Sequence, residues 1–71
     1  MWSKMIEEQE LEAVKNFMLT KGPEYPYGQW LIEGPFKTDF GYGYWLQIND
    51  GFLPDDFLIN FGLHKLDNIE I

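Results

Sequence analysis

Side chains that could perform chemistry are few in this chain of 71 residues, which has no cysteine and a single histidine. Outside tyrosine, the only hydroxyl groups belong to Ser3, Thr20 and Thr38. Nucleophilic catalysis needs such a group beside a base that activates it, and the sequence places no obvious nucleophile near His64. A domain this small also has little room for a substrate pocket, which usually needs about 300 Å³ or more. The sequence therefore predicts a protein that is not an enzyme.

Metal ligands are equally sparse. Asp50, Asp55 and Asp56 form an acidic cluster, but they lack the alternating spacing and the final glutamate of a calcium-binding loop. Pro54 interrupts the cluster, and the absence of cysteine excludes a thiolate zinc site. We expect no metal and no cofactor.

Charge is the property that points most clearly to a function. The chain has 12 acidic and 5 basic residues, a formal net charge of -7. Solubility alone accounts for a charge of this size in a small domain. A sharper interpretation is docking on a basic patch of another protein, where complementary fields raise the association rate and select the partner.

Such basic patches are common on proteins that bind nucleic acids. The composition therefore favours a small acidic interaction module, in its sharper form an inhibitor of the phage or mobile-element type whose carboxylates imitate phosphates. This expectation rests on composition, since no spacing identifies a target.

The elements that must position these residues divide the chain into two parts. Residues 3–21 contain no glycine or proline and are rich in helix-forming residues. Ile6, Ala13 and Phe17 fall on one stripe at helical spacing. Ser3 is placed to cap the helix, and Lys21 followed by Gly22-Pro23 is a stop signal. A long N-terminal helix is predicted.

The rest of the chain has the composition of short strands and turns. Strands are expected at 29–34 and 42–49, separated by a turn region at 35–41, and Asn49-Asp50-Gly51 predicts a turn after the second strand. Residues 57–61 form either a third strand or a short helix opened by Pro54-Asp55-Asp56, and residues 66–71 alternate like a final edge strand. The predicted fold is one α+β domain over residues 1–71, with one long helix packed on an antiparallel sheet of three to four strands.

Alternation along the strands separates two faces of this sheet. Trp30 and Ile32 share a face with Tyr42, Tyr44, Leu46 and Ile48, and this face is expected to meet the helix. The second face holds Leu31, Glu33, Trp45 and Gln47. On this second face, Trp45 either packs beneath residues 52–61 or forms part of a partner-binding surface. The candidate partner-binding residues are Leu31, Glu33, Trp45, Gln47, Asp50, Asp55 and Asp56.

Two other functions remain open. A structural homodimer could use the second sheet face. Alternatively, Gly41-Tyr42-Gly43-Tyr44-Trp45 resembles the aromatic part of the RNP1 motif, which implies stacking of single-stranded nucleic acid on Tyr42, Tyr44 and Trp45. Phe40 stands where that motif has lysine or arginine, and the chain contains no arginine. The net charge also repels phosphates, so direct nucleic-acid binding is disfavoured.

The cellular location of the protein is inferred from its short apolar runs and its acidic first 12 residues. The longest apolar runs, such as Phe17-Met18-Leu19, are too short for a membrane span of roughly 20 residues. Four glutamates in the first 12 residues do not suit a secretory signal. We expect a cytoplasmic protein without membrane contact.

Overall fold

A computed structural model describes residues 1–65 of the chain. Its single sheet has four antiparallel strands in the order β2-β3-β1-β4. The elements, in chain order, are β1 (Trp2–Glu7), the 3-10 turn η1 (Glu8–Glu10), α1 (Leu11–Leu19), β2 (Trp30–Thr38), β3 (Gly41–Ile48), α2 (Asp55–Phe61) and β4 (His64–Lys65). The fold is a small α+β domain.

The predicted long N-terminal helix over residues 3–21 is wrong. Residues 2–7 form β1, and helical structure comprises only the three residues of η1 and the nine of α1. Ser3 does not cap a helix but lies buried in the strand. The physical reason is pairing at long range: all six residues of β1 pair with β3, and such contacts override local helix propensity.

Helical structure begins at Glu8, directly after Glu7, which is the last residue of β1 and the N-cap of η1. Glu7 and Glu10 form a capping box, in which the Glu7 backbone N–H donates to Glu10 Oε1 at 3.0 Å. At the other end, the Met18 carbonyl accepts from the N–H groups of Lys21 and Gly22 at 2.8 and 3.2 Å. The helix therefore stops close to the predicted signal, but it starts five residues later than predicted.

The segment between α1 and β2 is held by groups of β2. The Trp30 indole Nε1–H donates to the Gly22 carbonyl at 2.9 Å. Within the segment, only glycine fits at position 28, because a Cβ atom there would stand 1.4 Å from the Pro23 carbonyl oxygen. This close backbone approach lets the chain turn back onto the edge of the sheet.

The free edge of β2 is partly occupied by the same segment. The Ile32 N–H donates to Glu24 Oε2 at 3.1 Å, and the Tyr25 N–H donates to the Trp30 carbonyl at 2.8 Å. Further along, Pro35 has no N–H to offer. An exposed row of unpaired N–H and C=O groups invites pairing with another chain, so these features protect the edge at residues 30–35.

The two predicted strands are present with changed lengths. β3 lies within one residue of the predicted range 42–49, whereas β2 runs on to Thr38 through a bulge between Glu33 and Phe36. The predicted turn region at 35–41 is therefore wrong in its extent. The turn at Asn49-Asp50-Gly51 is confirmed, with a positive φ of 86° at Gly51 and a bond from the Phe52 N–H to the Asn49 carbonyl at 3.3 Å.

Residues 55–61 form the helix α2, so the alternative of a third strand at 57–61 is wrong. Pro54 occupies the N-cap, and Asp55 and Asp56 lie in the first turn, where the helix dipole favours negative charge. Gly62 ends the helix with φ 99°, and the Leu63 N–H donates to the Leu58 carbonyl at 2.9 Å. The final strand predicted at 66–71 lies outside the described residues.

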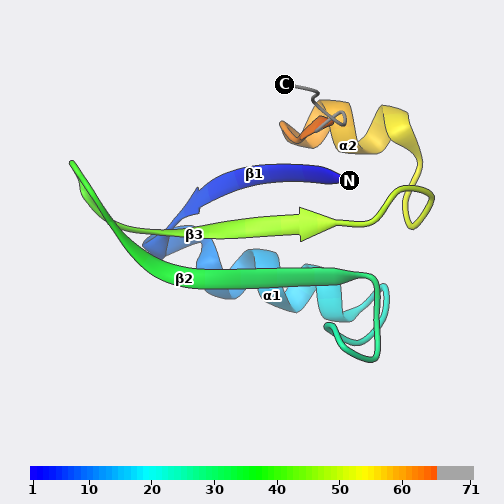
Figure 1. Ribbon diagram of the computed structural model, residues 1–71, viewed down its shortest axis with the longest axis horizontal. Coiled ribbons are helices and arrows are strands. Elements are labelled where there is room, and N and C mark those ends of the chain that lie inside the picture. Colours follow the sequence, from blue (N-terminus) through cyan, green and yellow to red (C-terminus); the bar gives the residue numbers. More distant parts are fainter. Residues whose placement is uncertain (66–71) are drawn as a thin grey trace, which may run out of the picture.

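Both helices pack against the same side of the sheet, because residues of both belong to one core cluster. In the view of Figure 1, α1 lies behind β2 and α2 lies beyond β1. Phe17 of α1 stacks on Phe57 of α2 with ring centroids 5.6 Å apart. Met18 and Leu58, the buried residues of the two helices, join sheet residues in a single core cluster: Trp2, Met18, Trp30, Leu46, Ile48, Leu58 and Leu63. The predicted helix-facing side of the sheet is confirmed for Trp30, Leu46 and Ile48.

Candidate functional site: the open face of the sheet

The side of the sheet opposite the helices, here named the open face, has no helix over it within residues 1–65. Two cross-strand rows form its centre. Each row crosses β1, β3 and β2 in that order, and the rows are Ser3–Gln47–Leu31 and Met5–Trp45–Glu33.

Apolar side chains on the open face are accessible to solvent. Met5 is 44% exposed, and Leu31 and Trp45 are partly exposed. Phe36, 47% exposed, extends the apolar surface along β2 past the bulge. Met5 also covers Gly43, where an added Cβ would lie only 2.8 Å from the Met5 sulfur.

Residues 52–61 do not cover Trp45. Phe52, Leu53, Phe57 and Phe61 pack against the core cluster on the opposite side of the sheet. Of the two alternatives for Trp45, packing beneath residues 52–61 is therefore wrong. The side chain is partly exposed on the open face.

The polar groups of the open face are largely uncharged. Glu33 is the only charged residue in the two central rows, and its Oε1 accepts a hydrogen bond from Gln47 Nε2 at 2.8 Å. This bond runs diagonally between β2 and β3. It holds the Glu33 carboxylate beside Trp45, its cross-strand partner.

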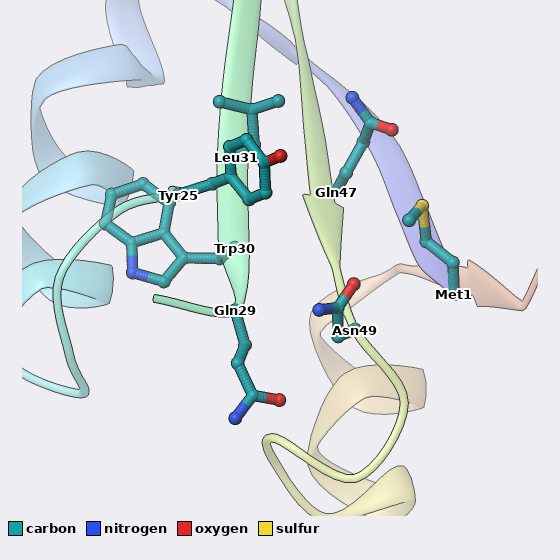
Figure 2. Close-up of a pocket in the computed structure, with 7 residues that line it drawn as sticks. All are labelled: Met1, Tyr25, Gln29, Trp30, Leu31, Gln47 and Asn49. Carbon is teal, nitrogen blue, oxygen red and sulfur yellow. The ribbon is translucent and has the colours of Figure 1, made fainter. Parts of the chain in front are cut away.

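A hollow of about 160 Å³ opens at the end of the open face nearest the N-terminus of β1. Figure 2 shows the ring of Tyr25 lying over Leu31, with the side chains of Gln47 and Asn49 across from them. The hollow is lined by Met1, Tyr25, Gln29, Trp30, Leu31, Gln47 and Asn49. Its lining is largely apolar, and three of its seven residues carry a carboxamide.

The structure brings together four of the predicted partner-binding residues and separates the other three. Leu31, Glu33, Trp45 and Gln47 are neighbours on the open face. Asp50 follows the end of β3, next to Met1. Asp55 and Asp56 lie exposed on α2, in the helix layer.

Asp50 is paired with the N-terminus of the chain. The Met1 amine donates to Asp50 Oδ1 at 2.8 Å, and this hydrogen bond lowers the pKa of the Asp50 carboxyl. The carboxylate is therefore ionised throughout the neutral range, with its charge partly balanced by the amine.

The RNP1-like residues do not form one stacking platform. Strand alternation places Tyr42 and Tyr44 on the side of the helices and Trp45 on the open face. Bases stacked on Trp45 would therefore lie on the other side of the sheet from bases stacked on Tyr42.

Ser3 and His64 are cross-strand partners between β1 and β4, a proximity that the sequence did not indicate. An activated serine needs a hydrogen bond to its base, and none joins these two side chains among residues 1–65. In the same range, no group of three or more His, Asp or Glu side chains is arranged to hold a metal ion, and no helix is long and apolar enough to cross a membrane.

Two larger hollows lie elsewhere. One, of about 370 Å³, lies between the helices and is lined by Ala13, Val14, Phe17, Phe57 and Phe61. The other, of about 420 Å³, lies beneath the β2–β3 turn and includes Phe40 and Tyr42 in its lining. Both exceed the roughly 300 Å³ of a typical small-molecule site, for which little room was expected in so small a domain. Neither hollow includes a residue of the predicted partner-binding set.

Comparison with protein-family models, curated protein sequences and solved structures found no match to this chain. Functional inference therefore rests on the geometry of the open face.

Sequence reasoning missed several residues of this site, Met5 and Tyr25 among them. Met5 falls within the predicted helix at 3–21, and the sequence analysis gave Tyr25 no role. The available signal was the position of Glu7 and Glu10, which at helical spacing fall among the apolar residues of the predicted stripe. Two charges there indicate that the helix does not run unbroken from residue 3.

Proposed function

We propose that the protein is a non-enzymatic interaction module that docks through its open face on a basic surface of a partner protein. The observation that carries the proposal is the partly exposed Trp45 on a sheet face without a covering helix in the described residues. Tryptophan is enriched among the residues that dominate binding energy at interfaces, and exposed apolar patches usually mark interaction sites.

The basic character of the partner is proposed from charge. The net charge of -7 favours association with a positive surface. Glu33 supplies a carboxylate at the centre of the open face, and Glu7 supplies another at the end of β1. Because Asp55 and Asp56 belong to the helix layer, they act in this proposal through the long-range field, while Glu33 makes the contact.

In its sharper form, the proposal is that the partner surface is one that binds nucleic acid, and that docking blocks it. Such surfaces combine positive charge with exposed groups that stack on bases. The open face, with Trp45 and the carboxylates of Glu33 and Glu7, would compete for them. A cytoplasmic location remains part of this proposal.

Site-specific photo-crosslinking in a lysate tests the proposal. A benzophenone side chain at position 45 is expected to crosslink to a partner with a basic surface, and the yield is expected to fall with rising salt. The same group at Ile59, which is 58% exposed on α2, is the matched control and is expected to crosslink weakly. Equal crosslinking from both positions, or none from position 45, would contradict the proposal. Competition by an oligonucleotide decides the sharper form.

A second candidate function is a homodimer through the same face. The observation in its favour is the single charge in the two central rows, which lets two copies approach without crowding like charges. Sedimentation of the wild type at high concentration separates the two functions, because the homodimer requires twice the monomer mass. A protein that remains monomeric removes this candidate.

A further inference from the structure

Resting on the proposed docking of the open face, we propose that the hollow beside Tyr25 receives one aliphatic side chain of the partner. The partner segment that carries this side chain has lysine or arginine next to it. The hollow would thus be an anchor site, and Trp45 would contact a neighbouring part of the same partner.

The size and walls of the hollow suit a single aliphatic side chain. Its volume of about 160 Å³ is below the roughly 300–1,000 Å³ typical of small-molecule sites. Leu31, Met1 and the ring of Tyr25 supply the apolar contact, and Tyr25 lies over Leu31 as one wall (Figure 2). A cofactor or drug-sized substrate does not fit, whereas one leucine or isoleucine side chain does.

The polar groups of the hollow suit the main chain of a peptide. Gln29, Gln47 and Asn49 each carry a carboxamide, which both donates and accepts hydrogen bonds. Gln47 donates through Nε2 to Glu33, and its side-chain oxygen can accept a hydrogen bond from a main-chain N–H. Uncharged groups that donate and accept match the N–H and C=O groups on either side of an inserted side chain.

Charge complementarity selects the residues beside the anchor. No lysine, arginine or histidine lines the hollow. On β2, Glu33 follows Leu31 by two residues on the same face, and in the turn after β3 Asp50 follows Asn49. Met1 partly balances Asp50, so Glu33 is the stronger attraction. A cationic side chain next to the anchor would meet a carboxylate, and an anionic one would be repelled.

Three blocked tripeptides test the anchor without knowledge of the natural partner. Acetyl-Lys-Leu-Lys-amide, acetyl-Lys-Ser-Lys-amide and acetyl-Glu-Leu-Glu-amide are titrated to millimolar concentration into the full chain, and NMR signals are followed. The first is expected to shift the signals of Leu31, Gln47 and Asn49. The serine peptide is expected to bind about tenfold more weakly, because the apolar contact is lost. The glutamate peptide is expected to bind more weakly than the first, most clearly at low salt.

Two variants separate this inference from the proposed function. Tyr25→Ala removes a wall of the hollow and is expected to weaken binding of the first peptide several-fold. Ile59→Ala, at an exposed position on α2 away from the hollow, is the control and is expected to bind that peptide as the wild type does. No shift at Leu31, Gln47 and Asn49, or equal shifts with all three peptides, overturns the anchor site while the docking of the open face stands. If position 45 fails to crosslink but the peptides bind as expected, the proposed function is wrong and the hollow remains a peptide site.

Discussion

Replacement of Trp30 by alanine is expected to remove most of the free energy of unfolding, whereas replacement of Trp45 by alanine is expected to lower it much less. Trp30 is only 1% exposed in the core cluster, and its indole donates to the Gly22 carbonyl. Removal of such a side chain costs about 3–5 kcal/mol. Natural domains have a free energy of unfolding of about 0.05–0.15 kcal/mol per residue, so in a chain this short the loss consumes most of the stability.

Trp45 is the matched control, because it belongs to the same sheet but projects from the opposite face. Its loss removes cross-strand contacts with Met5 and Glu33, which are worth about 0.2–1 kcal/mol each. Urea unfolding followed by far-UV circular dichroism measures both variants. Equal destabilisation by the two replacements would contradict the assignment of the two faces.

Replacement of Ile6 by alanine is expected to cost about 2–5 kcal/mol, whereas replacement of the adjacent Met5 is expected to cost less than about 1 kcal/mol. Ile6 is 1% exposed, and Met5 is 44% exposed. The difference follows from strand geometry, in which successive side chains point to opposite faces. Thermal or urea unfolding of the two single variants measures it.

The same pair of variants tests the insertion of β1 into the sheet. In the inserted strand, the replacements at positions 5 and 6 differ in their effects. Lys4→Ala resembles neither, because Lys4 Nζ donates to the carbonyl of Phe61, the last residue of α2, at 3.1 Å. Similar small effects at positions 5 and 6 would indicate that β1 is not inserted between β3 and β4.

β3 and the first part of β2 could be predicted because their signals are local. Alternating apolar residues at 42–49, bounded by glycine and by Asn49-Asp50-Gly51, predict a strand and its turn without knowledge of the rest of the chain. The same alternation separated Trp30 from Leu31 and Leu46 from Trp45. Half of the candidate site therefore followed from the sequence.

The N-terminal strand could not be predicted from local preference. Residues 3–6 have good helix propensity, and their strand conformation arises from pairing with residues 44–47, about 40 positions away. Pairing at this separation leaves a weak local signal, because β-propensity reflects packing against neighbours more than the backbone itself. Met5 and the cross-strand neighbours Ser3 and His64 were missed for this reason.

The aspartates of the predicted site do not lie beside Trp45 in the structure. The prediction grouped them with it because they are close in the sequence. Asp50, Asp55 and Asp56 are close in the chain, but the turn after β3 carries the last two into the helix layer. The positions of Asp55 and Asp56 depend on whether residues 54–61 form a helix or a strand, and the sequence left this alternative open. The proposal for the partner accordingly depends on Glu33 more than on the aspartates.

Exposure of Trp45 is the central claim, and NMR with a soluble gadolinium chelate tests it most directly. The three tryptophans give three indole N–H signals, and measurements at low protein concentration exclude self-association. The account predicts strong broadening for Trp45 and weak broadening for Trp2 and Trp30, which are 5% and 1% exposed. Protection of Trp45 equal to that of Trp30 would show that the sheet is covered on both sides and would contradict the account.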